Sequence, residues 1–315
     1  MQLAMVGLGR MGKGISTRLL RKGYQLVAYN RSSQKADKLA EEEGANPARS
    51  LKEAVEMLDV PRIVWMMLPS GQVVAEHIEA LLPLLEPGDI LIDGGNSHYT
   101  DDIPRSESAD KKGVYYLDIG VSGGVWGLTE GFCMMIGGPR PAFEQIKPWL
   151  QTLAPENGYL YCGPTGAGHF VKMIHNGIEY GLLQALAEGF SLLRHSPFAE
   201  DLDFSQVCKT WNHGSVIRSW LLELAEKTFE ESPGLEEFRA WVEDSGEGRW
   251  TAQQALESSV PAPVLSLALM ERFRSREENS FSNRFIAALR HQFGGHEVKK
   301  KELSYKIEYP MLLEV

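Results

Sequence analysis

Three glycines near the start of the chain constrain its fold more than any other feature. Residues 2–12, QLAMVGLGRMG, place Gly7, Gly9 and Gly12 after an apolar run and at the opening of an amphipathic one. In a strand–turn–helix unit this spacing permits a tight turn, close approach of a pyrophosphate, and close packing of helix on strand. A second strand follows at the right distance, which favours dinucleotide binding over a purely structural turn. The predicted contacts are Gly7, Leu8, Gly9, Arg10, Met11 and Gly12.

The first half of the chain continues to alternate apolar, strand-like runs with amphipathic ones. Strand-like runs recur at 25–30, 62–68, 89–95, 114–120, 132–138 and 159–163. Alternating strands and helices indicate a doubly wound, parallel-rich sheet. After residue 163 the strand signals stop and the patterns are helical. We therefore predict an α/β Rossmann domain over residues 1–163, followed by an all-α substrate and oligomerisation domain over residues 164–315.

Composition excludes several classes of protein. Hydrophobic residues make up 43% and charged residues 23% of the 315, with a net charge of −10. An acidic surface disfavours nucleic acid as a partner, and no apolar run reaches the ~18 residues that span a membrane. The N-terminus shows no signal-peptide pattern, and the three scattered cysteines suggest reduced thiols. We expect a cytoplasmic protein that binds neither nucleic acid nor membrane.

The end of the second predicted strand bears on the choice of cofactor. An acidic residue at this point binds the ribose 2′-hydroxyl of NAD. Here the sequence is AYNRSSQK, with Asn30 in the acidic position and Arg31 and Ser32 after it. A guanidinium and hydroxyls suit a 2′-phosphate, so NADP is favoured over NAD. The alternative is that these residues only cap a helix and that Arg31 is solvated.

Residues 168–181, GHFVKMIHNGIEYG, mix apolar residues with acid–base groups. On a helix, Lys172, His175, Asn176 and Glu179 lie at i, i+3, i+4 and i+7 and form one polar stripe. This stripe is either a solvated helix face or a catalytic one, and nearby glycines would let other groups approach it. The apolar residues that suit a core are Val171, Met173, Ile174, Ile178 and Tyr180.

The same stretch closely resembles the signature helix of the decarboxylating 6-phosphogluconate dehydrogenases, in the β-hydroxyacid dehydrogenase superfamily. Three further stretches resemble that family: DGGNSHYTD at 93–101, LDIGVSGGVWGLTEG at 117–131, and LRHQFGGH at 289–296. The chain resembles the short form of the family. The related 3-hydroxyisobutyrate dehydrogenases carry a second asparagine where His175 stands.

The resemblance implies a role for each matching residue. Lys172 is the general base and Glu179 the general acid, while His175 and Asn176 orient the substrate. Leu68 and Asn96 join the cofactor contacts. Groups at the carboxylate end of 6-phosphogluconate are Asn96, Ser122, Gly123 and Gly124; groups at its phosphate end are Tyr180, Arg272, Arg290 and His296. Arg272 could instead be an exposed helix charge. The resemblance also implies a homo-oligomer, dimer or tetramer, in which Arg290 and His296 reach the neighbouring subunit's site.

One loop departs from the family pattern. Residues 244–251, DSGEGRWT, stand where the family has a lysine-containing loop, so that Ser245 replaces the lysine and Glu247 a threonine. No metal is expected, because His175 and Glu179 lack an evident third ligand. Two other readings remain: a related β-hydroxyacid dehydrogenase or imine reductase, and a dinucleotide-binding regulatory protein without turnover.

Overall fold

The computed structural model describes residues 2–294, 297 and 299. Its eight strands are β1 (Gln2–Val6), β2 (Gln25–Tyr29), β3 (Asn46–Pro47), β4 (Ile63–Met66), β5 (Ile90–Asp93), β6 (Tyr115–Ser122), β7 (Cys133–Gly137) and β8 (Tyr159–Gly163). They form one sheet in the order β3-β2-β1-β4-β5-β6-β7-β8. All neighbouring pairs are parallel except β6 and β7, which are antiparallel. The predicted parallel-rich Rossmann sheet is confirmed.

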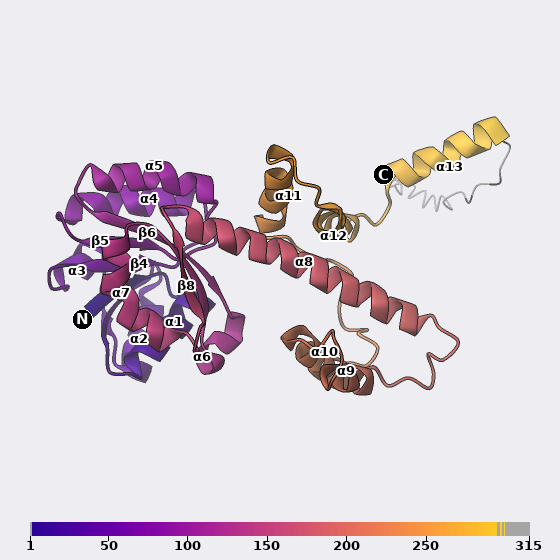
Figure 1. Cartoon of the computed structure of the whole chain (residues 1–315), viewed down its shortest axis with the longest axis horizontal. Coiled ribbons are helices and arrows are strands. Elements are labelled where there is room, and N and C mark those ends of the chain that lie inside the picture. Colours follow the sequence, from indigo (N-terminus) through magenta and orange to yellow (C-terminus); the bar gives the residue numbers. More distant parts are fainter. Residues whose placement is uncertain (1, 295–296, 298, 300–315) are drawn as a thin grey trace, which may run out of the picture.

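Helices cover both faces of this sheet (Figure 1). The helices of the first domain are α1 (Arg10–Leu20), α2 (Ser33–Glu43), α3 (Leu51–Glu56), α4 (Gln72–Leu81), α5 (Tyr99–Asp110), α6 (Gly127–Glu130) and α7 (Arg140–Leu153), with short 3-10 turns η1 (Leu82–Leu84) and η2 (Gly124–Trp126). Alternate residues of β1 enter opposite cores: Leu3 and Met5 pack with α1, α2 and α7, whereas Ala4 and Val6 pack with α3, α4 and α5. Sheet order reverses between β1 and β4, which opens a crevice at their carboxyl ends, where ligands bind in such folds.

The second domain is built along one long helix. Its helices are α8 (Ala167–Arg194), α9 (Phe204–Asn212), α10 (Trp220–Glu231), α11 (Glu247–Glu257), α12 (Pro263–Arg274) and α13 (Phe281–Gly294). α8 starts against the sheet and runs away from it, with α9 and α10 on one side and α11 and α12 on another (Figure 1). No strand lies among the described residues after β8, so the prediction of a helical second half is confirmed. The predicted division at residue 163 falls between β8 and α8 and stays a prediction.

Part of the predicted core of α8 is wrong. Met173 and Tyr180 are buried, but Val171 is 38% and Ile178 50% exposed. The buried residues of α8 face the sheet, α11 and α12, whereas Val171 and Ile178 lie on its exposed surface. None of the described helices is both long and apolar enough to cross a membrane.

Candidate functional site

The glycine loop joins β1 to α1 as the sequence predicts. Gly7 has φ +100°, and a Cβ on it would lie less than 3.0 Å from the carbonyl oxygen of Met67; a Cβ on Gly12 would clash equally with Gly7 O. Gly9, by contrast, borders open space. The first turn of α1 has no side-chain cap, so its N–H groups remain available. The loop therefore forms a cradle into which a pyrophosphate fits.

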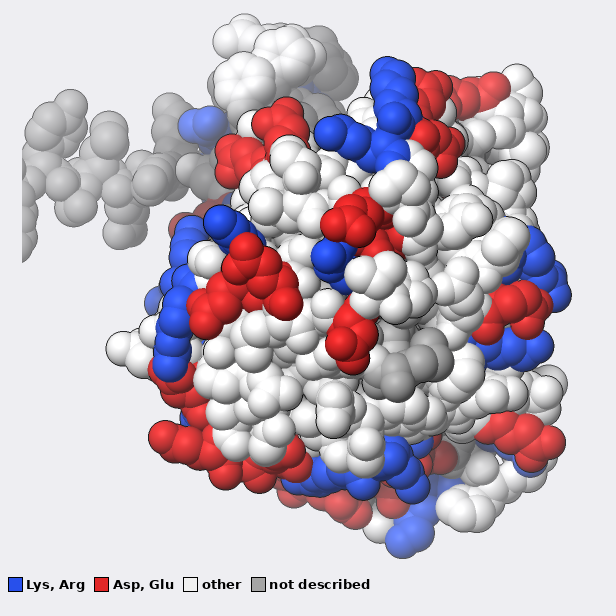
Figure 2. Space-filling view, turned by 90° about the vertical axis from the view of Figure 1, so that its left-hand side faces the viewer, with Lys and Arg blue, Asp and Glu red and all other residues white. Residues whose placement is uncertain are grey.

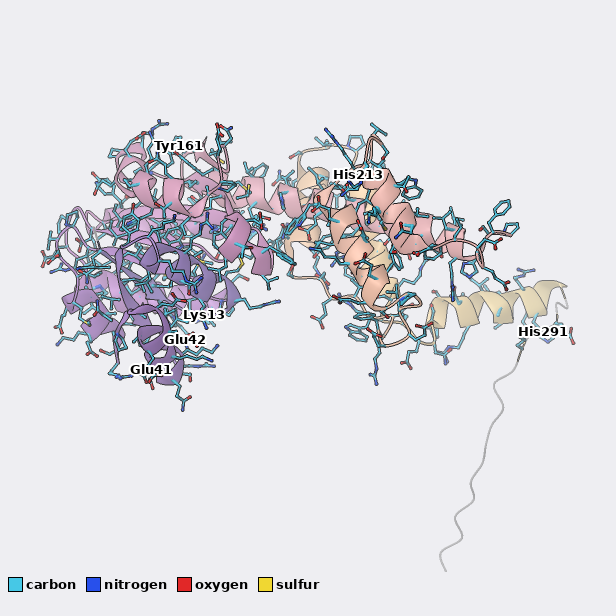
Figure 3. All side chains as sticks on the ribbon, turned by 90° about the horizontal axis from the view of Figure 1, so that it is seen from below. Lys13, Glu41, Glu42, Tyr161, His213 and His291 are labelled. Atoms are coloured by element: carbon cyan, nitrogen blue, oxygen red, sulfur yellow. The ribbon has the colours of Figure 1, made fainter. Side chains whose placement is uncertain are left out.

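A hollow of about 400 Å³ lies beside this loop. Leu8, Gly9 and Arg10 line it together with Lys13 and Lys35. The sequence analysis did not select the two lysines, although helix N-termini that bind phosphates are often joined by nearby cations. Lys13 pairs with Glu42 at 2.9 Å across α1 and α2 (Figure 3). Elsewhere on the Rossmann domain, basic and acidic side chains are interspersed (Figure 2).

The end of β2 carries the predicted cofactor residues. Asn30 Oδ1 accepts a hydrogen bond from Leu8 N at 2.9 Å, and its Nδ2 donates to Ser32 O at 3.1 Å. Asn30 thus ties the end of β2 to the glycine loop. Ser32 precedes α2, but its hydroxyl oxygen accepts no hydrogen bond from the helix backbone and instead the hydroxyl donates to Gln34 Oε1, so the capping alternative is wrong for this side chain. Arg31 is exposed.

The ends of β4 and β5 meet on the same edge of the sheet. A Cβ on Gly95 would lie less than 3.0 Å from Leu68 O, so the loop after β5 lies directly against the loop after β4. Leu68 also contacts the Gly7 position. Asn96 follows Gly95 and is exposed. The predicted contacts Leu68 and Asn96 therefore lie at the crevice, beside the glycine loop.

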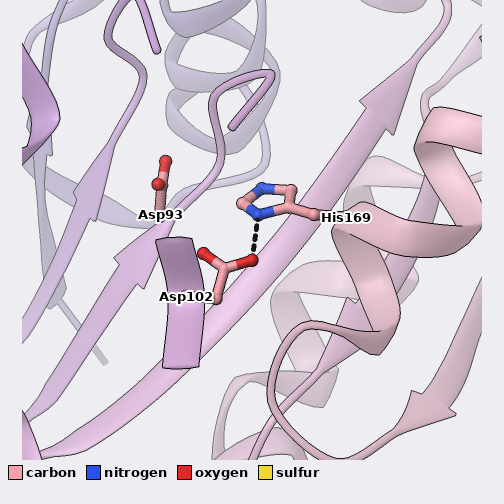
Figure 4. A group of neighbouring side chains, drawn as sticks. All are labelled: Asp93, Asp102 and His169. Atoms are coloured by element: carbon pink, nitrogen blue, oxygen red, sulfur yellow. Dashed lines mark hydrogen bonds and ion pairs between the residues drawn. The ribbon is translucent and has the colours of Figure 1, made fainter. Parts of the chain in front are cut away.

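A buried ionic cluster anchors α8 to the loop after β5 and to α5 (Figure 4). His169 Nδ1 lies 2.7 Å from Asp102 Oδ2, and Tyr116 donates to Asp102 Oδ1 at 2.8 Å. Arg105 pairs with Asp93 at 3.1 Å. Although burial opposes the charge, the Asp102 carboxylate raises the pKa of His169 to about 9. Burial raises the pKa of Asp102 to about 6.

This cluster has ligand atoms close enough for a metal ion, since Asp93, Asp102 and His169 converge. The Arg105 guanidinium, however, already lies 3.1 Å from Asp93 and 3.9 Å from Asp102. A divalent cation there would face a buried positive charge. The chemistry of the donor set therefore fits a structural ion network.

Close packing sets the position of Lys172. A Cβ on Gly168 or on Gly120 would overlap the backbone or Lys172 itself at less than 3.0 Å, so α8 crosses β6 in direct contact. Asp118 of β6 accepts hydrogen bonds from Gly166 N and His169 N at the start of α8. Lys172 therefore packs directly against Gly120, two residues before the carboxyl end of β6.

The four residues of the predicted polar stripe lie on α8 and differ in how deeply they are buried. Lys172 and Asn176 are buried, whereas His175 and Glu179 are half-buried. Lys172 Nζ donates to Asn176 Oδ1 at 2.5 Å, and His175 Nδ1 lies 3.0 Å from the same oxygen. The solvated-face reading is wrong for Lys172 and Asn176. Burial lowers the pKa of Lys172, and the charges of Glu247 and Glu179 raise it in part. A lysine with a lowered pKa suits a general base.

The loop after β6 lies beside this lysine. Ser122 pairs with Cys133 across β6 and β7, and Cys133 is close enough to interact with Lys172 electrostatically. Gly123 and Gly124 follow with φ +131° and +54°, and Gly124 is exposed. The positive φ values turn the chain sharply after Ser122. This loop thus places Ser122, Gly123 and Gly124 near the polar stripe of α8.

Tyr180, one turn beyond Asn176 on α8, contacts Arg272, the other predicted phosphate-binding residue that the structure places nearby. The Arg272 guanidinium lies 3.5 Å from the centre of the Tyr180 ring, and the Tyr180 hydroxyl accepts a hydrogen bond from Ser245 N at 3.3 Å. Arg272 also donates to Glu243 O at 2.6 Å. The alternative of a free helix charge is therefore wrong for Arg272, which is half-buried against Tyr180.

Of the two C-terminal candidates, only Arg290 lies among the described residues, and it does not join this group within the chain. Arg290 is exposed on α13, which lies at the end of the molecule away from the Rossmann domain (Figures 1 and 3). The predicted residue His296 lies outside the described residues. A contribution of Arg290 to a neighbouring subunit's site stays a prediction.

Besides Lys13, Lys35 and His169, the sequence analysis missed Glu247 and His98. Glu247 is buried against Asn176, and His98, in the loop after β5, lies 4.8 Å from the Trp250 ring. Their only sequence signal was proximity to motifs: Glu247 stands in the departing loop and His98 in DGGNSHYTD. A glycine-loop sheet with a buried lysine packed on β6 defines a dinucleotide-binding protein with a helical second domain.

Comparisons with known proteins specify this class further. Residues 2–163 match the family model described as the NAD binding domain of 6-phosphogluconate dehydrogenase, and residues 168–308 match its C-terminal domain. The chain belongs to the 6-phosphogluconate dehydrogenase family. It is 43% identical to the NAD(+)-dependent, decarboxylating 6-phosphogluconate dehydrogenase of Haloferax volcanii over 96% of this chain and 100% of that protein.

Two longer proteins that the chain resembles are also 6-phosphogluconate dehydrogenases. The NAD(+)-dependent, decarboxylating 6-phosphogluconate dehydrogenase of Bacillus subtilis (strain 168) is 33% identical over 96% of this chain and 66% of its own length. The solved 6-phosphogluconate dehydrogenase of Plasmodium falciparum, described with its cofactor NADP+ and its substrate 6-phosphogluconate, superposes with a TM-score of 0.80. It is 29% identical, over 96% of this chain and 67% of that one.

Proposed function

We propose that the chain catalyses the oxidative decarboxylation of 6-phospho-D-gluconate to D-ribulose 5-phosphate and carbon dioxide. The observation that carries this proposal is Lys172, which is buried against β6, has a lowered pKa and is hydrogen-bonded to Asn176. The names of the Haloferax and Bacillus relatives, and the substrate in the Plasmodium structure, support the same reaction.

Lys172 performs two tasks in this reaction. As a neutral amine it takes the proton from the C3 hydroxyl of the substrate. A nicotinamide dinucleotide held at the glycine loop by Gly7, Gly9 and Gly12 would supply the hydride acceptor for C3. The product is a β-keto acid, which loses carbon dioxide readily. Lys172, now protonated, stabilises the enolate oxygen that develops.

The other groups of the stripe complete the proposed mechanism. Glu179, half-buried two turns further along α8, delivers a proton to C1 of the enediol. His175 and Asn176 orient the hydroxyl and keto oxygens. Ser122, Gly123, Gly124 and Asn96 bind the carboxylate end of the substrate. No step in this sequence requires a metal ligand from the chain.

The phosphate end is proposed to lie at Tyr180 and Arg272. Arginine presents a planar fork that matches phosphate, and its stacking on the Tyr180 ring holds the fork in place. In the proposed homo-oligomer, Arg290 and His296 of a neighbouring chain reach the same phosphate. Large apolar side chains exposed on α8, α12 and α13 support self-association; they include Ile178, Leu182, Val264, Leu267, Phe281 and Phe285.

NADP is the proposed cofactor. Asn30 leaves the end of β2 without a carboxylate, and Arg31 is exposed beside it, so a 2′-phosphate meets a cation and no repulsion. Lys35 adds a second cation at the hollow. The Haloferax and Bacillus relatives are NAD(+)-dependent, so the preference has to be measured with both dinucleotides.

A single assay tests this function. The protein is mixed with 6-phosphogluconate and either dinucleotide, nicotinamide reduction is followed by absorbance, and the sugar product is identified by mass spectrometry. We expect carbon dioxide and ribulose 5-phosphate in equal amounts with the reduced cofactor. Lys172→Ala should abolish reduction of the nicotinamide. Glu179→Gln should lower the rate of nicotinamide reduction less than it lowers the rate of ribulose 5-phosphate formation. Turnover of 3-hydroxyisobutyrate or of an imine, without turnover of 6-phosphogluconate, would reject the proposal.

A further inference from the structure

Glu247 is a buried carboxylate that the proposed mechanism does not use. It opens α11 and is only 2% exposed. Its Oε1 accepts a hydrogen bond from Asn176 Nδ2 at 3.0 Å. Its Oε2 is buried and has no hydrogen-bond partner among the described residues. A buried carboxylate oxygen without a partner is costly, so its retention beside the catalytic stripe calls for a reason.

The packing of α11 on α8 holds this carboxylate in place. The hydroxyl of Thr251 donates to Glu247 O at 2.8 Å and lies 2.9 Å from Met173 O. A Cβ on Gly177 would meet Thr251 at less than 3.0 Å, and a Cβ on Gly248 would meet the Tyr180 ring as closely. The two helices therefore fit together only with glycine at both positions. Glu247 also lies in the first turn of α11, where the helix dipole favours a negative charge.

Asn176 is the bridge between this carboxylate and the lysine. Its amide nitrogen donates to Glu247, and its oxygen accepts from Lys172. If the amide were flipped, its NH₂ group would face the lysine and its oxygen would face a carboxylate. Both contacts would then be repulsive. The carboxylate of Glu247 thus fixes the one orientation of Asn176 that supports Lys172.

We propose that Glu247 is a positioning residue of the Lys172 site, which orients Asn176 and supplies a buried negative charge for the protonated lysine. The inference rests on the proposed function for its catalytic consequence. The ammonium form of Lys172 is required at decarboxylation, when the lysine stabilises the enolate. Glu247 keeps that form accessible in a buried place where burial alone would remove the proton.

The pH dependence follows from the groups that face Lys172. Glu179 lies on the same helix as Lys172, Glu247 on α11 and Cys133 on β7. His175, also on α8, contacts the same Asn176 oxygen as Lys172. Burial lowers the pKa of Lys172, and Glu247 is the first of the charges that raise it again. Removing that charge lowers the pKa further. Because the base must be neutral, the acidic limb of kcat/KM then moves to lower pH.

Glu247→Gln separates charge from shape, because the glutamine oxygen can still accept from Asn176. We expect the acidic limb of kcat/KM to move down by about one pH unit, the size expected for one charge a few ångströms away. Glu247→Ala should show the same shift and a further loss of kcat, since Asn176 is no longer oriented. Glu257→Gln is the matched control: it removes an exposed carboxylate from the other end of α11 and should leave the limb in place.

A second readout does not depend on turnover. The free protein is treated with limiting acetic anhydride across pH, and acetylation of Lys172 is quantified by mass spectrometry against exposed Lys52. The midpoint for Lys172 should fall in Glu247→Gln and stay unchanged in Glu257→Gln. Unchanged midpoints in all three proteins, or equal shifts in both variants, would overturn the inference. If the wild type fails to turn over 6-phosphogluconate, the proposed function fails, and the labelling result still decides the role of Glu247.

Discussion

His169→Gln is expected to remove a pH-dependent part of the protein's stability. His169 lies on α8, is 1% exposed, and pairs with Asp102 of α5 at 2.7 Å. Its folded-state pKa of about 9 exceeds the ordinary value of 6.5. A raised histidine pKa stabilises the folded state fully below about pH 6.5, and this stabilisation is lost as pH rises through 9. Glutamine retains a hydrogen-bond donor for Asp102 but cannot carry the charge.

The magnitude follows from the same two values. A difference of about two and a half pKa units corresponds to about 3 kcal/mol. The change at Asp102 offsets part of this free energy. His169 lowers the pKa of Asp102, so in the variant this buried carboxyl has a higher pKa and the variant itself loses stability as the pH rises. We therefore expect the stability advantage of wild type over variant to shrink by about 1–3 kcal/mol between about pH 6 and about pH 10.

The assay is urea unfolding of both proteins at these two pH values, at one protein concentration. Groups common to the two proteins that do not interact with His169, such as Lys172, cancel in the difference, whereas the change at Asp102 is included in the expected range. His195→Gln is the control, because His195 is exposed immediately after the same helix, where its Nδ1 lies near Ser191 O. Its difference from wild type should not depend on pH. An equal, pH-independent difference for His169→Gln would refute the charged His169–Asp102 pair.

Three further substitutions test the geometry of the site. Gly120→Ala places a Cβ less than 3.0 Å from Lys172, so α8 must shift; kcat should fall at least ~100-fold while dinucleotide affinity, measured by fluorescence titration, is retained. Gly12→Ala collides with Gly7 O and should weaken dinucleotide binding at least ~10-fold in the same titration, without loss of folded protein by circular dichroism. Arg31→Ala should raise the KM for NADP about tenfold and leave that for NAD nearly unchanged; equal effects on both would reject the 2′-phosphate contact.

The elements that the sequence predicted well are those with local signals. The glycine loop combines three glycines, a preceding strand and a following helix. Gly12 is required by its contact with Gly7, and Gly7 by its contact with Met67 after the adjacent strand, whereas Gly9 borders open space. The Lys172 stripe depends on helical spacing alone, since residues three and four apart share a face. Both features could therefore be predicted from short windows of sequence.

Glu247 shows what such windows leave out. Its burial depends on Gly177 and Gly248, which allow α11 to approach α8 across about 70 residues of sequence. No periodicity within α11 indicates that approach, because the carboxylate stands at the first residue of its helix. His169 was missed for the same reason: its partners lie on α5 and β5, and their contact depends on how α8 meets the sheet.

The error over Val171 and Ile178 has a different cause. Apolar residues on several faces of one helix predict burial on all of them. In the described chain the sheet, α11 and α12 pack on α8, and its exposed surface carries Ile178 and Leu182 at 50% and 53% exposure. α12 and α13 expose further apolar residues, among them Leu267 and Phe285. The pattern therefore predicts burial correctly only if a second copy supplies the missing surface, which is the arrangement that would also bring Arg290 to a neighbouring Tyr180.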